Sequence, residues 1–152
     1  MSQTVSLESI SLDAASKVAQ LTLEHGRISK MAPLAVAVLD VRGTLKAYLA
    51  DDGASLLRFE IAHAKAWSVL GMGLGARELE RRASKVPLFF NNLQVLSDGK
   101  MPTVQGGLLI RNSAGQIIGS VGVSGDTSAN DELCGLTAIK QVGLIADHGD
   151  QQ

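Results

Sequence analysis

Four stretches of the chain carry helical patterns: apolar residues recur on one face of the first and the last, good helix formers fill the second, and the third is short and charged. They span residues 11–25, 56–72, 76–83 and 128–146. Capping residues support these limits, because Ser11 and Ser55 stand where a side-chain oxygen can accept the first free backbone N–H groups. Gly26 is a natural stop for the first helix. Ser128 and Asp131 form a capping box for the last helix.

Shorter apolar runs predict two β-hairpins. The first joins residues 34–39 to residues 44–49, and the second joins residues 107–111 to residues 116–123. The connections from Asp40 to Gly43 and from Asn112 to Gly115 both place a polar residue first and a glycine fourth, as type I turns prefer. Residues 86–99 mix turn and strand signals, so we predict a loop with one short strand there.

This order of elements predicts the α+β class, with an antiparallel sheet of about five strands and helices packed on it, in a single domain over residues 1–152. The composition agrees, since a chain of 152 residues can build one core without disulfides, and an apolar fraction of 45% leaves surface for a partner. The net charge of -1 provides no field that would attract nucleic acid or an acidic membrane. We expect neither as a partner.

Cysteine usage indicates the compartment. Cys134 is the only cysteine, so no internal disulfide can form and a reducing environment is expected. Residues 1–8 lack the basic start and apolar run of a signal peptide, and no stretch approaches the ~20 apolar residues of a membrane span. A cytoplasmic location is therefore predicted.

The most specific local feature is the glycine-rich junction from Gly119 to Asp126. Glycine inside a strand weakens it and marks the close approach of another backbone, a side chain or a ligand. Something should therefore pack tightly against this strand. Backbone amides at the start of the next helix could bind an anion, but Asp126 and Asp131 already bring negative charge there, which favours self-capping.

The helix predicted around His63 has two apolar faces and no wide polar one. One face carries Ile61 and Lys65, and the other carries Phe59, His63 and Trp67. The sheet can cover one face, so a second subunit or an apolar ligand is expected on the other. A buried ammonium at Lys65 needs an acid or an anionic ligand, whereas in the alternative its stem follows the core edge and its amine reaches water.

The histidines do not predict a dedicated metal site. His25, His63 and His148 are scattered, without a second ligand at metal spacing. A cofactor that brings its own metal needs only one axial ligand, which His25 or His63 could supply; the alternative is an ordinary surface or hydrogen-bonded histidine. Cys134 lies in the apolar stripe of the last helix and is predicted to be a buried, inert thiol.

These residues include the markers by which the chain resembles the GlcG/HbpS family of haem-degrading and haem-binding domains, which also includes the C-terminal domain of PduO-type corrinoid adenosyltransferases. The resemblance covers about residues 12–144. Its markers are Ala35–Asp40 with Gly43, Asp52–Ala54, Ile61–Ala62 with Lys65–Ala66, Gly106–Gly107, and Ile118–Gly119 leading through Gly122–Gly125 to Asp131–Glu132. Two positions depart from the family pattern: Ala50 replaces an arginine and Leu109 replaces a proline.

The resemblance implies a profilin-like sandwich, in which helices pack on a five-stranded antiparallel sheet. It also implies assembly into homo-oligomers such as octamers and, in some members, binding of haem or a related tetrapyrrole. Other members are associated with glycolate, glycerol or diol metabolism and have no settled activity. Ala50 removes a basic residue that could meet a propionate, and Leu109 leaves its strand free to pair.

The leading hypothesis from the sequence is a tetrapyrrole-binding subunit of a homo-oligomer, with a haem-degrading or storage role. Its pocket would lie between the helix of Lys65, the Gly106–Gly107 strand and the turn that ends at Asp126. Lys65 or Arg111 would provide a cation for the carboxylates. The candidate cofactor-binding residues are His25, His63, Lys65, Gly106, Gly107, Arg111, Gly122, Ser124, Gly125 and Asp126.

Two alternatives remain open at this point. One is an enzyme that acts on a carboxylated or aromatic metabolite, with Lys65 binding a carboxylate and Asp51, Glu60 or Asp126 carrying a proton. The other is a structural protein whose small residues only pack subunits together, without a ligand.

Overall fold

The computed structural model describes residues 1–150, which form five helices and one five-stranded sheet. In chain order the elements are α1 (Leu12–Ile28), β1 (Ala35–Asp40), β2 (Leu45–Ala50), α2 (Arg58–Met72), α3 (Ala76–Lys85), α4 (Pro87–Leu96), β3 (Gly107–Arg111), β4 (Ile117–Ser124), α5 (Ser128–Gln141) and β5 (Ile145–Asp147). The strands lie in the order β2-β1-β4-β3-β5, and each neighbouring pair is antiparallel. The predicted α+β class and antiparallel sheet are confirmed.

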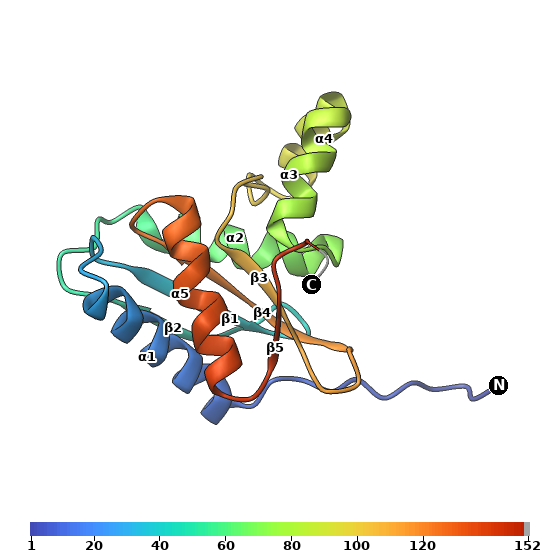
Figure 1. The fold of residues 1–152 in the computed structure, drawn as a ribbon. Helices are drawn as coiled ribbons and strands as arrows, with labels where there is room; N and C mark the ends of the chain where they lie inside the picture. The colour runs from blue at the N-terminus through green and yellow to red at the C-terminus, as the bar shows by residue number, and fades with distance from the viewer. Residues whose placement is uncertain (151–152) are drawn as a thin grey trace.

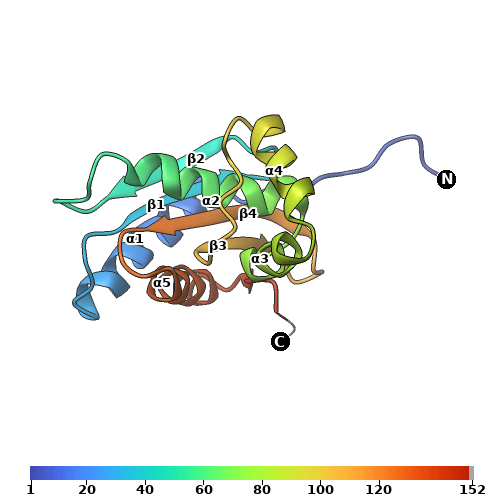
Figure 2. The ribbon, with the colours of Figure 1, turned by 90° about the horizontal axis from the view of Figure 1, so that it is seen from above.

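Helices cover both faces of the sheet (Figure 1). α1 and α5 lie on one face and α2 lies on the other, as Figure 2 shows from above. α3 and α4 follow α2 as an arm that projects beyond the sheet (Figure 1). Both predicted hairpin turns form, because the N–H of Gly43 donates to the carbonyl oxygen of Asp40 and that of Gly115 to Asn112, each at 2.9 Å.

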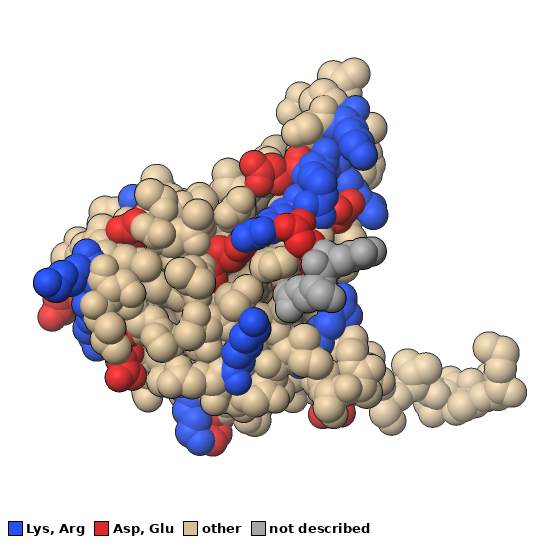
Figure 3. Space-filling view, viewed as in Figure 1, with Lys and Arg blue, Asp and Glu red and all other residues tan. Residues whose placement is uncertain are grey.

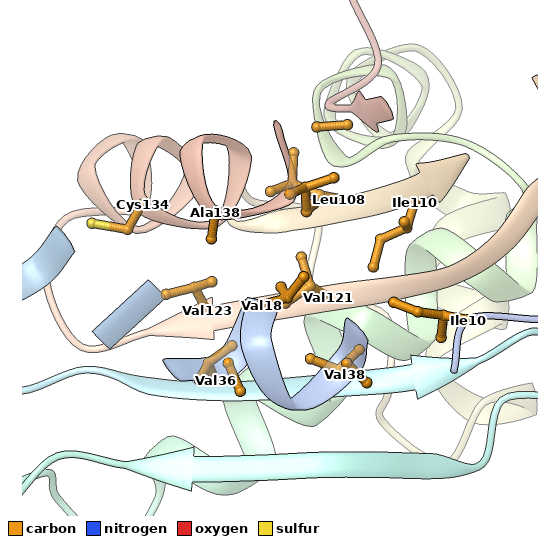
Figure 4. Close-up of a cluster of buried hydrophobic side chains, with 14 of the residues drawn as sticks. Ile10, Val18, Val36, Val38, Leu108, Ile110, Val121, Val123, Cys134 and Ala138 are labelled. Atoms are coloured by element: carbon orange, nitrogen blue, oxygen red, sulfur yellow. The ribbon is translucent and has the colours of Figure 1, made fainter. Parts of the chain in front are cut away.

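The main core lies between the sheet and the pair α1 and α5 (Figure 4). Its labelled members are Ile10, Val18, Val36, Val38, Leu108, Ile110, Val121, Val123, Cys134 and Ala138. The strand residues among them alternate along each strand, because successive side chains point to opposite faces of a sheet. Val36 and Val38 of β1 and Val121 and Val123 of β4 thus point toward α1 and α5.

Across its middle, the opposite face of the same strands carries a row of small residues. Ala37, Gly122 and Gly107 are register partners across β1, β4 and β3, and they form a row, here termed the small-residue row. A Cβ atom at Gly122 would overlap the carbonyl oxygen of Ala62 on α2. One at Gly107 would lie 2.5 Å from the carbonyl oxygen of Lys65. The backbone of α2 therefore rests directly on the sheet.

The prediction of a loop with a short strand over residues 86–99 is wrong, because these residues contain helix α4. Pro87 occupies the first turn of α4, where a missing N–H leaves no hydrogen bond unmade. Phe90 is only 5% exposed and anchors the helix to the second apolar cluster. The fifth strand is β5 instead, and it pairs with β3 at Leu109, the position where the family has proline.

Three predicted helix limits also need correction. α1 continues past Gly26 to Ile28, and this glycine makes room for Leu34, whose Cδ1 would lie 2.6 Å from a Cβ atom. α5 ends at Gln141 rather than near residue 146, because Gly143 adopts a φ of 83°. α2 begins at Arg58 without a side-chain cap from Ser55.

The cap of α5 differs by one residue from the predicted box. The side chain of Thr127, not Ser128, accepts the N–H of Asn130 at 3.2 Å. None of the helices in the described part of the chain is long and apolar enough to cross a membrane.

Replacing Gly122 by alanine tests the contact between α2 and the sheet. The new methyl group would overlap backbone atoms of Ala62 and Ala66, so Gly122→Ala is expected to destabilise the fold by about 1–3 kcal/mol or more in urea unfolding. Gly71→Ala is the matched control, because its methyl would lie 3.4 Å from the ring of Trp67, an ordinary contact, and should stabilise by about 0.4–1 kcal/mol. Equal effects of the two substitutions would contradict the close packing.

Candidate functional site

The outer face of α2 carries a strip of aromatic side chains. Phe59, His63 and Trp67 follow one another at helical spacing, because residues four apart lie on one face. The rings of Phe59 and His63 are stacked with centroids 5.5 Å apart, and Tyr48 of β2 meets Phe59 edge-on at 4.9 Å. These four residues are here termed the aromatic strip.

The segment between α4 and β3 extends this surface. Lys100 Nζ lies 5.4 Å from the ring centroid of Trp67, within cation–π distance. A cavity of about 180 Å³ opens beside the same ring. Its lining residues are Trp67, Gly71, Met72, Leu93, Leu96, Ser97 and Met101. Flat rings, an ammonium group and an apolar hollow therefore share one surface.

His63 is the nitrogen donor of the aromatic strip. Burial, and to a lesser extent the positive charge of Lys100, lower the pKa of His63 below its usual value. The imidazole is therefore neutral at physiological pH, and a neutral imidazole can bind a metal ion. The strip and the neighbouring Lys100 together provide what a planar, apolar, carboxylated macrocycle with a central metal needs: a flat surface, a ligand and a cation.

Lys65 lies on the inner face of α2 and is 3% exposed. Its ammonium donates to the carbonyl oxygen of Val123 at 2.8 Å and to the carboxylate of Asp131 at 3.4 Å. Burial lowers the pKa of Lys65 and raises that of Asp131, because both charged forms lose water. Of the arrangements predicted for Lys65, the structure therefore contains the buried ammonium paired with an acid. The charge of Lys65 joins α2 to β4 and α5.

The space expected to form a pocket beside Lys65 contains the protein's own atoms. A Cβ atom at Gly106 would lie 2.7 Å from Lys65 Nζ, and one at Gly125 would overlap the carbonyl oxygen of Pro33. The sequence left open whether a backbone, a side chain or a ligand approaches these glycines. At Gly107, Gly122 and Gly125 the approaching group is a neighbouring backbone.

The other candidate residues have separate surroundings. His25 Nε2 lies 2.7 Å from Gln141 Oε1 and links α1 to α5, on the opposite side of the sheet from the aromatic strip. Arg111 pairs with Asp147 of β5 at 3.0 Å. Ser124 is fully buried and its Oγ accepts from Arg58 at 3.0 Å.

Asp51 and Asp126, two of the three carboxylates considered for proton transfer, serve local contacts. Asp126 accepts the N–H of Ala32 and of Thr127, and these hydrogen bonds lower its pKa. A hydrogen bond and ion pair with Arg27 likewise lower the pKa of Asp51. Both groups are therefore ionised acceptors, and neither is the partner of Lys65.

Tyr48 and Lys100 belong to the surface around the aromatic strip but were not predicted from the sequence. Tyr48 alternates with its neighbours on β2, so its face could have been found once the sheet order was known. Lys100 follows Asp98 and Gly99, both with positive φ, and its approach to Trp67 depends on how this turn folds back from α4. No local pattern indicates that contact.

Within residues 1–150, no three histidine, cysteine, aspartate or glutamate side chains gather as a metal ion would require. Cys134 is buried, as predicted, and burial raises the pKa of its thiol to about 11. A thiol with that pKa is not a nucleophile at neutral pH.

Comparison with known proteins gives a consistent family. A family model described as "Haem degrading protein HbpS-like" matches residues 10–140. A crystal structure of a PduOC–haem complex is 25% identical with a TM-score of 0.80, covering 90% of this chain and 96% of that chain. ORFY of Klebsiella pneumoniae is 26% identical with a TM-score of 0.80, covering 92% and 97%.

The crystal structure of HbpS is 23% identical with a TM-score of 0.77, covering 92% of this chain and 94% of that chain. That likeness shows the shared fold. A search of the curated proteins found no match.

Removing the buried ammonium tests its structural role. Lys65→Met leaves Asp131 buried without its partner, so we expect a loss of about 3–5 kcal/mol in urea unfolding. The double variant Lys65→Met, Asp131→Asn should recover most of that loss, because the amide oxygen can still accept the N–H of Asp126. A double variant as unstable as the single one would contradict this account of the pair.

The lowered pKa of His63 predicts a pH dependence of stability. The unfolded chain binds a proton at this residue more readily than the folded chain, so protonation favours unfolding as the pH falls through the unfolded value of about 6.5. The wild type should therefore lose stability relative to His63→Gln between about pH 7.5 and 5.5. If the free energies of unfolding in urea of the two proteins change in parallel with pH, the site does not disfavour the charged imidazole.

Proposed function

The chain belongs to the HbpS-like family of haem degrading proteins, and on that premise we propose that it binds haem or a related tetrapyrrole on the aromatic strip. The observation that carries the proposal is the stacked, neutral imidazole of His63 in the middle of an aromatic face. The haem complex of PduOC, whose fold this chain shares, supports the same ligand class.

The residues of this surface fit the group. His63 would hold the central iron, which supplies the redox chemistry when the cofactor is bound. Trp67 and Phe59 would lie against the apolar ring, since large flat ligands need such contact. Lys100, whose Nζ lies 5.4 Å from the ring centroid of Trp67, would meet a carboxylate.

We also propose that the chain works as a homo-oligomer in the reducing cytoplasm. The arm formed by α3 and α4 supports assembly into an oligomer, because the exposed fractions of Leu88, Val95 and Leu96 on α4 reach 79%, 81% and 80%. Figure 3 shows an uncharged tip on the arm, beyond the basic and acidic residues of α3. Apolar surface of this kind is typical of a subunit contact.

Hemin titration of the purified chain, followed at the Soret band, tests the binding site. The wild type should give a saturable band, and His63→Ala should shift it and weaken binding roughly tenfold or more, a loss of at least about 1.4 kcal/mol. His25→Ala is the matched control on the opposite side of the sheet and should change neither.

Two results would contradict the proposal. A wild type without a saturable band does not bind haem. A Soret band that is unchanged in His63→Ala but altered in His25→Ala would show that the iron ligand lies on α1. The family description also names degradation, so the bound sample is then given ascorbate in air: loss of the band faster than for free hemin supports degradation, and a persistent band supports storage.

A further inference from the structure

The last turn of α2 contains a glycine that its backbone does not require. Gly71 lies within the helix and its φ is not in the left-handed region. A Cβ atom there would lie 3.4–3.7 Å from three carbons of the six-membered ring of Trp67, which is ordinary van der Waals contact. Alanine would therefore fit, and it favours a helix more than glycine does.

Gly71 differs in this respect from the glycines of the small-residue row. At Gly122 an added side chain would overlap the backbone of α2. At Gly71 it would instead cover the ring of Trp67 and reduce the cavity beside it. The physical effect of this glycine is to leave one side of the indole open.

The cavity that Gly71 borders has the size and lining of an aromatic subsite. Its volume is about 180 Å³, and Met72, Leu93, Leu96 and Met101 make most of its wall. A cavity of about 150 Å³ with a similar apolar lining is large enough to bind benzene. The space therefore suits one or two fused rings and is too small for a whole tetrapyrrole.

We propose that Gly71 keeps open an apolar subsite for a planar group of one or two rings, stacked beside Trp67. That group is either the edge of a macrocycle ligated by His63 or a free aromatic molecule of the same size. Only the first source rests on the proposed haem function. His63, Trp67 and Gly71 stand four residues apart on one face of α2, so an edge that reaches past Trp67 meets the cavity.

Two substitutions at one position test the subsite. Gly71→Ala should raise the Tm of the ligand-free protein by about 1–4 °C and weaken binding roughly threefold. Gly71→Leu fills the cavity and should weaken binding roughly tenfold or more. 2-Naphthol is one probe, followed by quenching of Trp67, which is the only tryptophan of the chain. Hemin is the other, followed at the Soret band.

The two probes separate the sources. Weaker hemin binding by Gly71→Leu, with an unchanged band position, assigns the cavity to the macrocycle edge. Weaker 2-naphthol binding alone assigns it to a free aromatic ligand, and this result stands even when the wild type gives no Soret band and the haem proposal fails. Wild-type affinity of Gly71→Leu for both probes, or no binding of either by the wild type, overturns the subsite.

Discussion

The close contact between α2 and the small-residue row determines how the helix presents its other side chains. Gly122 and Gly107 admit the backbone of α2 to a distance that any Cβ atom would prevent. The hydroxyl of Ser120 fastens the helix further by donating to the carbonyl oxygen of Ala66 at 2.7 Å, and Lys65 adds its bond to Val123. A helix held this closely has a fixed rotation about its axis.

That rotation decides which residues remain for a ligand. With Ala62 and Ala66 against the sheet, Phe59, His63 and Trp67 must face outward. A helix with two apolar faces needs two covers, and the sheet supplies only one. The glycine-rich strand, the buried lysine and the aromatic face are thus parts of one arrangement, in which the inner face packs on the sheet and the sheet leaves the outer face uncovered.

The sequence was sufficient for the hairpins, the sheet type and the two-faced character of α2, because each rests on local turn chemistry or residue periodicity. The sequence was insufficient to predict α4, because a proline such as Pro87 occurs at the start of loops as well as of helices. The sequence also could not separate a backbone from a ligand as the partner of Gly122, since both require the same small residue. The position of Lys100 over Trp67 depends on tertiary folding of a turn, which no local pattern encodes.

The decisive measurement is a crystal structure of the chain with bound hemin, which would locate the ligand relative to α2. We expect iron bonded to the imidazole of His63, the ring plane against Trp67, and α2 still packed on Gly122. A haem inserted between α2 and the small-residue row, or one held by His25 on the opposite side of the sheet, would contradict this expectation.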